Sequence, residues 1–399
     1  MANVSSSNGL EKRPKLRFPG FDEQYKQCRI GDIYAERSQR GASDMELLSV
    51  TMNDGVKPRS EIEGKDNSSE DKSNYKIVRK GDMVYNSMRM WQGANGISPC
   101  DGIVSPAYTV LMPKQEINNG YFAALFKSTK LINEFRKNSQ GMTSDTWNLK
   151  YPQIETIKVQ IPSVSEQDKV SALFSVLDAR IVAQAQLVES LKKYKRGVMQ
   201  SIFRHSTQEG WKTVKLGEIF KKVSRRNTNG DIKNVITNSA EYGLIPQRDF
   251  FVKDIAVDGN TSNYYVIEEG DFVYNPRKSN TAPYGPFNRY TLKEKGIISP
   301  LYTCLVLQED INPAYLAWYF KSDAWYRYIY DNGSQGVRHD RVSMTDDLLM
   351  GIPVSVPTVS KQKKVAEILD AVEYRLSAAQ GEYDTLVKLK NGFMQQLFI

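Results

Sequence analysis

The chain contains one segment twice: KYKRGVMQSIF runs from Lys193 to Phe203, and KLKNGFMQQLF runs from Lys388 to Phe398. The two copies lie 195 residues apart, and their Gly, Met and Phe positions coincide. A segment that occurs in mid-chain and again at the end of a 399-residue chain is typical of an internal duplication. The sequence therefore predicts two copies of one structural unit, each ending in this segment.

The duplication extends toward the start of each copy, but the spacing drifts there. It rises from 186 residues at the first paired motif to 195 residues through the last third. The other paired motifs are RIGDIY and KLGEIF (from Arg29 and Lys215), KGDMVYN and EGDFVYN (Lys80 and Glu269), GIVSPAY and GIISPLY (Gly102 and Gly296), INNGYFAALFKS and INPAYLAWYFKS (Ile117 and Ile311), and two SQG segments (Ser139 and Ser334). Surface loops tolerate insertions and packed rods do not. We therefore expect a loop-rich domain at the front of each copy and a rod at its back.

The last third of each copy has the apolar spacing of a long helix. Apolar residues recur mostly at steps of three, four or seven, which places them on one helix face. They are Val170, Leu173, Leu177, Ile181, Val188, Leu191, Val198 and Ile202, and then Val365, Ile368, Val372, Leu376, Tyr383, Leu386, Phe393 and Leu397. Pro162 and Pro357 stop the preceding segments, and Ser165 and Ser360 are the expected N-caps. A helix of roughly 38 residues is roughly 57 Å long, too long to bury its stripe on a small domain.

The other long helix is the natural partner for each stripe, so we expect a coiled coil. Parallel and antiparallel pairing both fit the spacing, and a pseudo-twofold relation between the copies favours the antiparallel one. The remaining sequence has short strand and turn patterns, and two short helices whose aromatic face we interpret as core. The predicted fold is α+β, with two mixed α/β domains alternating with two helices. The expected segments are a flexible tail (1–15), domain 1 (16–164), helix 1 (165–204), domain 2 (205–359) and helix 2 (360–399).

Composition is ordinary for a soluble globular protein, and many such proteins are mildly basic. The net charge is +8 and the pI is about 9.0, which favours phosphate-bearing partners through counterion release. We expect no membrane helix, because no apolar run approaches the ~18 residues required. Cys28, Cys100 and Cys304 are odd in number and far apart. They indicate buried thiols in a reducing cytoplasm.

The sequence lacks the motifs of most enzymes. Its two histidines, His205 and His339, form no cluster with metal-ligand spacing. No phosphate loop or dinucleotide fingerprint is present, nor is the Asn/Asp-Pro-Pro-aromatic site of adenine methyltransferases. Asp54 followed by Glu63 and Lys65 is only a faint match to a nuclease pattern. A basic, duplicated chain without a catalytic set is more typical of a reader or adaptor than of an enzyme.

The ordered set of motifs resembles the specificity subunits of Type I restriction–modification systems. The resemblance is carried by the paired GDxVYN and GI(V/I)SPxY motifs, the SQG segments, the IPxxSxQxK helix entries and the KxKxGxMQxxF helix ends. It covers the chain from about Leu16 to Ile399. Each motif is weak alone, but the same order twice in one chain is a strong signal.

The resemblance implies a non-catalytic subunit of host defence in which each target recognition domain reads one half of a bipartite site in double-stranded DNA. It implies an antiparallel coiled coil that sets the spacer and docks two modification subunits, which methylate adenine with S-adenosylmethionine. Two restriction subunits, which use ATP and Mg, are an optional further partner. This chain itself would bind no cofactor and no metal.

DNA contact is expected from polar, aromatic and basic residues in the loops that differ between the copies. In domain 1 they are Thr51, Asn53, Arg89, Trp91, Gln92, Ser139, Gln140, Thr143, Ser144 and Trp147. In domain 2 they are Asn238, Ser239, Tyr242, Gln247, Arg248, Arg277, Lys278, Asn280, Gln335, Arg338, His339 and Arg341. Because the loops differ in length and chemistry, the two half-sites should differ.

Two alternatives stay open at this point. One is a methyltransferase or nuclease with built-in recognition domains, although no stretch is left over for a catalytic domain. The other is a coiled-coil scaffold that does not bind DNA. Strong, salt-dependent binding to a duplex would distinguish the specificity subunit from the scaffold.

Overall fold

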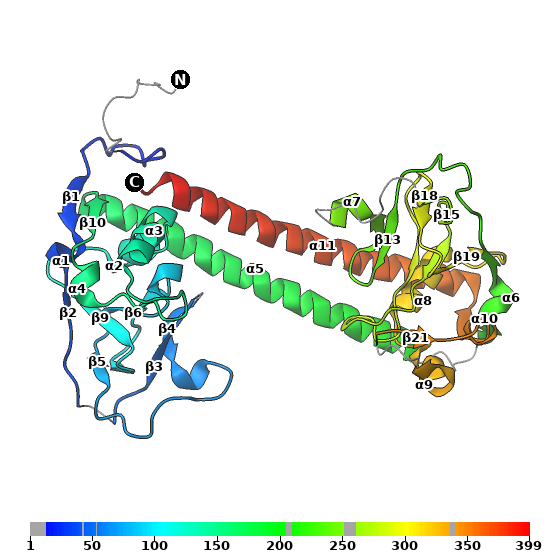
Figure 1. Cartoon of the computed structure of the whole chain (residues 1–399), viewed down its shortest axis with the longest axis horizontal. Helices are drawn as coiled ribbons and strands as arrows, with labels where there is room; N and C mark the ends of the chain where they lie inside the picture. The colour runs from blue at the N-terminus through cyan, green and yellow to red at the C-terminus, as the bar shows by residue number, and fades with distance from the viewer. Residues whose placement is uncertain (1–12, 42–43, 53, 205–209, 251–260, 336–339) are drawn as a thin grey trace. The chain divides into compact units, whose positions relative to one another are not determined.

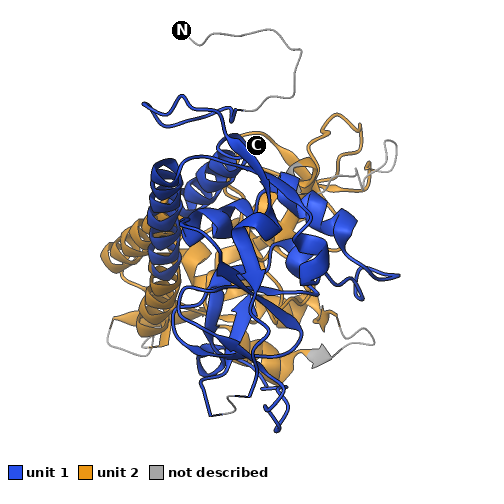
Figure 2. Cartoon of the chain, turned by 90° about the vertical axis from the view of Figure 1, so that its left-hand side faces the viewer, with its two compact units in different colours: residues 1–186, 380–399 blue, residues 187–379 orange. Residues whose placement is uncertain are grey.

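The structure is a computed structural model that describes residues 13–41, 44–52, 54–204, 210–250, 261–335 and 340–399 (Figure 1). The chain forms two compact units, which we treat separately. Unit 1 comprises residues 1–186 and 380–399, and unit 2 comprises residues 187–379 (Figure 2).

Unit 1 contains a four-stranded antiparallel sheet in the order β2-β9-β6-β7 and three strand pairs, β1-β10, β3-β4 and β5-β8. Its strands are β1 (Lys26–Arg29), β2 (Tyr34–Glu36), β3 (Leu48–Thr51), β4 (Gly55–Pro58), β5 (Lys76–Val78), β6 (Met83–Asn86), β7 (Asn95–Ile97), β8 (Gly102–Val104), β9 (Tyr108–Pro113) and β10 (Lys158–Ile161). Its short helices are α1 (Ile30–Ile33), η1 (Arg59–Glu61), η2 (Met90–Gln92), α2 (Asn119–Leu125), α3 (Thr129–Asn138) and α4 (Tyr151–Ile154).

Unit 2 repeats this topology. Its four-stranded sheet has the order β12-β19-β16-β17, and the pairs β11-β22, β13-β14 and β15-β18 take the corresponding places. The strands are β11 (Trp211–Lys215), β12 (Phe220–Val223), β13 (Ile236–Ser239), β14 (Gly243–Pro246), β15 (Tyr265–Ile267), β16 (Phe272–Tyr274), β17 (Phe287–Arg289), β18 (Gly296–Ile298), β19 (Thr303–Leu307), β20 (Ser334–Gln335), β21 (Val342–Ser343) and β22 (Pro353–Pro357). The short helices are α6 (Leu216–Ile219), α7 (Gln247–Phe250), α8 (Pro313–Lys321), α9 (Tyr326–Asn332) and α10 (Asp346–Met350). The predicted duplication and the mixed helix and strand content are thus both present.

The aromatic faces of α2 and α8 are core, as expected. Asn118 and Asn312 cap these helices by accepting hydrogen bonds from backbone amides of the first turn. The buried rings include Tyr121, Phe122 and Phe126 in unit 1 and Tyr315, Tyr319 and Phe320 in unit 2. These aromatic side chains each remove a large apolar area from water and hold the helix on its sheet.

The two long helices are α5 (Val164–Arg204) and α11 (Val359–Gln396). They begin one residue before the predicted starts, so Ser165 and Ser360 lie inside them and the predicted N-caps are wrong. The carbonyl oxygens of Ser163 and Thr358 accept the first amide hydrogen bonds instead. The polar residue that precedes Val164 and Val359 is therefore the capping position.

The predicted stripe is largely buried. Val170, Leu177, Val365, Val372 and Leu386 are buried, and Leu173, Ile181, Leu191 and Leu376 are partly buried. The prediction that Ile368 is buried is wrong, because its exposed fraction is 49%. The next residue, Leu369, is buried instead, with an exposed fraction of 0%. Steps of three and four from Val365 both fit a helical stripe, and the core of unit 2 lies on the side of Leu369.

Within each unit, segments of the two long helices contact one another. In unit 1, Phe174 stacks on Phe398, Lys390 donates to Asp178, and Arg180 pairs with Glu382 at 3.1 Å. Residue numbers fall along α11 as they rise along α5, so these segments run in opposite directions. In unit 2 the Lys195 ammonium lies 2.6 Å from the Glu373 carboxylate.

Two details differ from the sequence-based expectations. By length and composition alone, α5 contains a stretch apolar enough to cross a membrane, whereas no membrane helix was expected. Asp178 and Arg180 interrupt this stretch and pair with residues of α11. Of the three cysteines, all free thiols, Cys304 alone is buried, while Cys28 and Cys100 are partly exposed.

A buried glutamine ties the start of each long helix to its domain. Gln167 donates to the Pro162 carbonyl at 3.0 Å and accepts from the Asn118 amide at 3.0 Å. Gln362 makes the same two bonds, to Pro357 and from Asn312, both at 2.8 Å. Each side chain thus satisfies two backbone groups, one at the helix entry and one at the cap of α2 or α8.

We expect Gln167→Met and Gln362→Met each to lower the free energy of unfolding by about 1–3 kcal/mol, because a buried donor and acceptor lose their partners. Chemical denaturation measures the change, and the exposed Gln200→Met on α5 is the matched control. Since the contacts repeat, the two effects should be similar. If Gln167→Met and Gln362→Met changed the free energy of unfolding no more than the control does, these hydrogen bonds would not be what holds the helix entries.

Candidate nucleic-acid interface

Three predicted segments of unit 1 lie together at one edge of the four-stranded sheet. They are the β3–β4 turn, the segment after β6 that contains η2, and the loop 139–147. The turn packs on β7, where a Cβ on Gly96 would lie 2.7 Å from the Gly55 Cα. Gln140 and Asn148 exchange backbone hydrogen bonds that close the loop, and the Leu149 amide donates to Ser87 at 2.8 Å. Residues far apart in sequence are thereby brought into one surface.

An aromatic contact joins two of these segments. The rings of Trp91 and Trp147 meet edge to face with their centroids 5.2 Å apart. The Arg136 guanidinium lies 5.7 Å from the centroid of Trp91. Both indoles are partly exposed, so this cluster offers flat and cationic groups to a ligand while it holds the segments together.

The other candidates in unit 1 divide by what their side chains do. Gln92, Gln140, Thr143 and Ser144 are exposed, and Arg89 is partly exposed with no side-chain partner among the described residues. The hydroxyl of Thr51 donates to Gly55 and accepts from the Asp54 amide, and Ser139 donates to Phe135. Those two hydroxyls close local turns, so we remove them from the proposed contacts. Asn53 lies outside the described residues.

Unit 2 brings the corresponding three segments together. The β13–β14 hairpin is tied to β16 and β17 through Asn238, whose amide donates to Val273 at 2.9 Å and accepts from Asn288 at 2.7 Å. The segment after β16 pairs with the start of β21 and the residues just before it: Lys278 donates to the Asp340 carbonyl at 2.8 Å, and Val342 donates to the Pro276 carbonyl at 2.9 Å. The convergence seen in unit 1 is therefore a property of the repeated fold.

Two candidates of unit 2 have structural roles. Asn238 is 4% exposed and its side chain is engaged on both sides, so it cannot reach a base without breaking the hairpin contact. Ser239 accepts from the amides of Glu241 and Tyr242 at 3.2 Å each and so caps the turn. We remove both residues from the proposed contacts, because a polar side chain in a hairpin is equally suited to internal hydrogen bonding.

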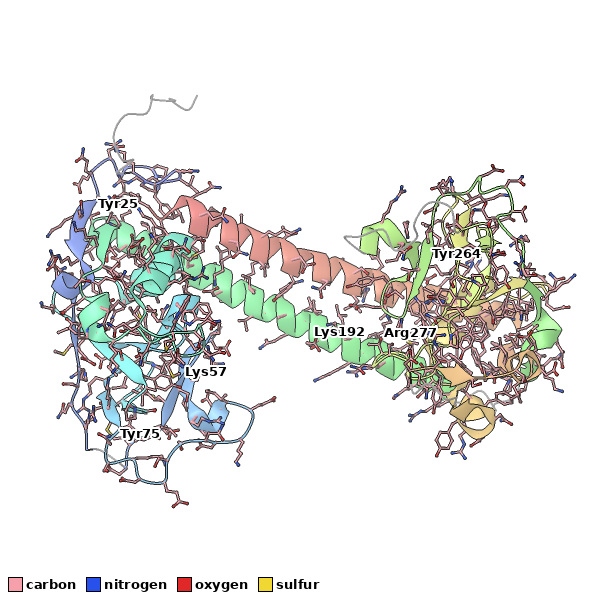
Figure 3. All side chains as sticks on the ribbon, viewed as in Figure 1. Tyr25, Lys57, Tyr75, Lys192, Tyr264 and Arg277 are labelled. Atoms are coloured by element: carbon pink, nitrogen blue, oxygen red, sulfur yellow. The ribbon has the colours of Figure 1, made fainter. Side chains whose placement is uncertain are left out.

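Two arginines in this surface share one carboxylate. Arg277 lies 3.5 Å and Arg341 lies 3.9 Å from Asp340, and the Arg277 side chain is 67% exposed (Figure 3). The two arginines are also neighbours in an antiparallel bridge. Tyr302 lies close by: burial raises the pKa of its phenol, and the charges of Arg277 and Arg341 oppose that rise.

The remaining candidates of unit 2 differ in exposure, and some lie outside the described residues. Tyr242, Arg248 and Asn280 are exposed, and Gln247 and Lys278 are partly exposed. Lys278 and Asn280 line a groove of about 580 Å³ together with Tyr284, Tyr330 and Asp340. Gln335 is described only in its backbone, as part of β20. Arg338 and His339 lie outside the described residues.

Sequence reasoning missed Arg136, Asp340, Tyr302 and Lys57. Arg136 precedes the first SQG segment by one helical turn, which is a usable signal, and Asp340 stands between two predicted basic residues. Lys57 pairs with Asp54 at 3.0 Å on the β3–β4 hairpin (Figure 3). Tyr302 is the last residue of the shared GIISPLY motif and so lies outside the segments that differ between the copies.

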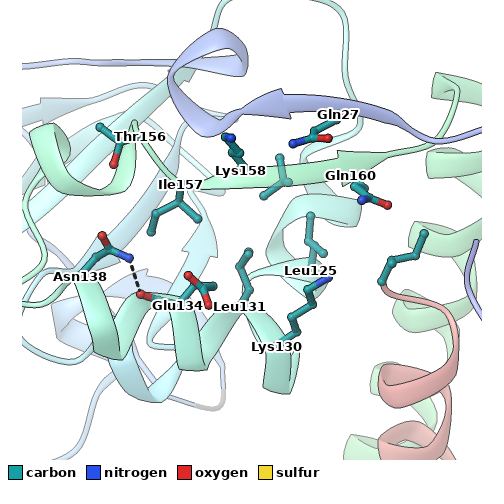
Figure 4. A pocket seen from close by; sticks show the side chains of 12 residues that line it. Gln27, Leu125, Lys130, Leu131, Glu134, Asn138, Thr156, Ile157, Lys158 and Gln160 are labelled. Atoms are coloured by element: carbon teal, nitrogen blue, oxygen red, sulfur yellow. Dashed lines mark hydrogen bonds between the residues drawn. The ribbon is translucent and has the colours of Figure 1, made fainter. Parts of the chain in front are cut away.

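Unit 1 has a cavity of about 430 Å³ between β1, β10 and α3 (Figure 4). Asn138 donates to the Glu134 carbonyl there at 2.8 Å, and the Glu134 carboxylate pairs with Lys137. The one hydroxyl among its described lining residues, on Thr156, donates to Gln153. This lining has no nucleophile–base pair, and no group of His, Cys, Asp and Glu suited to a metal ion occurs among the described residues.

Comparison with known proteins gives consistent matches. Residues 23–193 match the family model of the Type I restriction modification DNA specificity domain. The chain is 23% identical over 351 residues to the Type I restriction enzyme MjaVIII specificity subunit of Methanocaldococcus jannaschii, covering 80% of this chain and 79% of that protein. The S subunit of a Type I system from M. genitalium has a TM-score of 0.58 at 15% identity, covering 97% and 99% of the two chains. The HsdS subunit of Thermoanaerobacter tengcongensis has a TM-score of 0.50 at 16% identity, covering 98% and 99%.

These matches agree with the motifs and the duplicated topology. The family model covers the domain of unit 1 and most of α5, while the likeness of fold covers nearly the whole chain. The resemblance inferred from the motifs is thereby confirmed: residues 23–193 match the model of the Type I restriction modification DNA specificity domain, and the chain is similar in sequence and fold to specificity subunits of Type I systems.

Proposed function

We propose that this chain is the DNA-recognition subunit of a Type I restriction–modification enzyme and that each unit reads one half of a bipartite site. The observation that carries the proposal is the convergence of the same three segments in both units. The core motifs around these segments repeat, whereas the segments themselves differ. Two domains with the same core and different surface loops are suited to binding two different DNA sequences.

The chemistry of the two surfaces supports different half-sites. Unit 1 offers the Trp91–Trp147 pair, Arg89 and Gln92, and unit 2 offers Arg277 and Arg341 beside a groove. Arginine binds the O6 and N7 atoms of guanine through two hydrogen bonds, and glutamine pairs similarly with adenine. Exposed lysines and hydroxyls suit phosphates, which position the protein without reading sequence.

We further propose that α5 and α11 form an antiparallel coiled coil and relate the units by a pseudo-twofold axis. The support is the buried stripe on both helices and the opposed direction of the contacts in unit 1. A 41-residue helix is about 60 Å long at 1.5 Å per residue. That length exceeds one DNA turn of ~34 Å, so the pair could set the spacer between half-sites.

In this proposal the chain acts within a cytoplasmic assembly and is not itself an enzyme. Two modification subunits dock on the helix pair and supply S-adenosylmethionine-dependent methylation of adenine. Where restriction subunits join, they bring ATP and Mg. The proposal gives this chain the tasks of binding, spacing and docking, with no cofactor of its own.

The proposal is tested by selecting bound duplexes from a randomised DNA library with the chain assembled with two modification subunits. We expect two conserved blocks separated by unselected bases, and an affinity that falls steeply as salt rises. A single continuous motif would contradict the bipartite arrangement. Absence of duplex binding at low salt would favour a scaffold role instead.

We expect the purified chain alone to transfer no methyl group to DNA. The measurement uses labelled S-adenosylmethionine and unmethylated genomic DNA, and adding the modification subunits is the positive control. Methylation by the partner-free chain would overturn the assignment of catalysis to the modification subunits.

We expect Asp340→Asn to tighten binding to non-specific DNA and to steepen its salt dependence by about one unit of log–log slope. The reason is that Asp340 neutralises part of the charge of Arg277 and Arg341, and each additional neutralised phosphate adds a slope of about −0.9. The control is Asp331→Asn, on α9 in the same unit. An unchanged slope would show that the two arginines do not face phosphates.

A further inference from the structure

Each unit contains a cluster of two lysines and one carboxylate, built from corresponding positions. In unit 1 the members are Lys127, which follows α2, Asp178 of α5 and Lys390 of α11. Lys390 donates to the Asp178 carboxylate. Burial lowers the pKa of the Lys127 ammonium, and the charge of Lys390 lowers it further, whereas Asp178 opposes the shift. A desolvated cation therefore stands beside an ion pair.

The cluster of unit 2 consists of Lys321 at the end of α8, Glu373 of α11 and Lys195 of α5. Lys195 lies 2.6 Å from Glu373. Burial lowers the pKa of Lys321 and Lys195 lowers it further, whereas Glu373 and Asp370 oppose the shift. The three positions correspond to those of unit 1 through the paired motifs, with α5 and α11 exchanging roles.

Unit 2 covers its two lysines with an aromatic ring. Lys195 and Lys321 lie 5.3 Å and 4.7 Å from the centroid of Trp318, within the range of cation–π attraction. Trp318 is 4% exposed, and its indole NH donates to Asp370 at 2.8 Å. The cluster of unit 2 thus contains two cations, two carboxylates and one π face, and its charges balance.

Unit 1 lacks both covering groups. The positions that correspond to Trp318 and Asp370 are Ala124 and Ser175. In their place lies a cavity of about 820 Å³, which Ala124, Ser175 and all three charged residues of the cluster line. The cavity that reaches the three charged residues of unit 2 measures only about 180 Å³. The cavity of unit 1, beside the two positions without a ring and a carboxylate, has the size of a ligand site.

The lining of this cavity is suited to a group that carries both an aromatic ring and a carboxylate. Its charged side chains, two lysines against Asp178, leave an excess of one positive charge. Asp54 also acts on Lys127, but Lys57 pairs with it at 3.0 Å. Ile97, Phe174 and Met394 provide an apolar wall. A flat ring would rest on that wall beneath the ammonium groups, and a carboxylate would balance the charge.

We propose that this cavity of unit 1 receives an aromatic side chain and an adjacent carboxylate from a partner protein, in the place that Trp318 and Asp370 fill in unit 2. The partner would be a subunit of the proposed assembly, so the identity of the occupant rests on the proposed function. A nucleotide would bring a ring and a negative charge as well, but unstacking a base from a duplex costs a few kcal/mol. A protein side chain enters without that cost, and the filled site of unit 2 is itself made of protein.

The chemistry of the site is tested on the full chain without DNA, with indole-3-acetate as the probe and indole and acetate as controls. We expect one binding site by calorimetry and at least tenfold weaker binding of either control. Ala124→Trp combined with Ser175→Asp should fill the cavity and abolish probe binding. Lys390→Gln leaves the cavity open and should weaken indole-3-acetate but not indole. Absence of binding, or binding that both variants leave unchanged, would overturn the proposal.

The source of the occupant is tested in the complex with two modification subunits and duplex DNA. Ser175→Cys, in a chain whose Cys28 and Cys100 are replaced by Ser, is labelled with a benzophenone and irradiated. A cross-link to a modification-subunit peptide with an aromatic and an acidic residue is expected. A cross-link to DNA, or none, would overturn a protein occupant. Probe binding needs no DNA, so a failure of the DNA-selection experiment would leave this site separately testable.

Discussion

Arg277→Ala is expected to weaken binding to DNA with the correct second half-site by about 1–3 kcal/mol, or roughly 5- to 150-fold, because one guanine would lose its two hydrogen bonds. Its side chain is 67% exposed, and Asp340, its nearest described charge partner, lies 3.5 Å away. Removing it should therefore alter the stability of unit 2 by no more than about 0.5 kcal/mol.

The dependence of the Arg277→Ala effect on DNA sequence distinguishes a base contact from a phosphate contact. Binding should become insensitive to the base that Arg277 reads, while selection in the other half-site stays intact. Lys221→Ala on β12, outside the three segments, is the control for loss of one charge in the same unit. Equal losses on DNA altered in either half would make Arg277 a phosphate contact instead.

The repeat allowed much of the fold to be predicted, because duplication supplies an internal comparison that a single copy lacks. Paired motifs identified the long helices and the aromatic core helices. Finer positions depended on which face the tertiary core covers. Ile368 and Leu369 both fit the helical spacing, and only the packing of unit 2 decides that Leu369 is buried.

The candidate interface was predictable as a set of loops but not residue by residue. Asn238 and Arg277 are both polar residues in predicted loops of unit 2. The structure uses Asn238 to hold a hairpin and leaves Arg277 exposed. Hydrogen bonds between residues distant in sequence decide such differences, and a single sequence does not record them. The sequence places Asp340 beside Arg341, and the structure adds Arg277 as its second arginine partner.

The lysine clusters show what the internal comparison adds once coordinates are available. Ala124 is an unremarkable helix residue in the sequence. The corresponding residue of unit 2 is Trp318, so unit 1 lacks an aromatic ring at this position. Ala124 lines a cavity where that ring would otherwise lie. Comparing two copies within one chain thus identifies a ligand class that neither copy would reveal alone.

Removing two turns from both long helices is expected to change the spacer that the assembly accepts. Deleting Ala183–Glu189 from α5 keeps the apolar stripe nearly in phase, since seven residues are close to two turns. The matching deletion in α11 is Ala379–Thr385. It preserves the pairs of Asp178 with Lys390 and of Lys195 with Glu373, which lie outside the deleted segments. Arg180 loses Glu382, an exposed partner whose contribution to stability is small.

Each helix becomes about 10 Å shorter at 1.5 Å per residue. At about 3.4 Å per base pair this corresponds to about three base pairs of spacer. Three base pairs also turn one half-site by about 100° around the duplex axis, since one turn takes about 10.5 base pairs. Methylation should therefore peak at a shorter spacer. It should also be weaker than in the original assembly, because shortening the helices does not rotate one unit by the full angle through which the half-site turns.

Scoring methylation across duplexes with the same half-sites and every spacer length measures this shift. Deleting Ala183–Glu189 alone is the informative comparison, because it leaves unequal helices and should cost stability without producing a sharp new optimum. If the double deletion methylates DNA efficiently at the original spacer, then the helices do not set the distance. The two units would in that case be positioned by the modification subunits, and the length of α5 and α11 would serve docking alone.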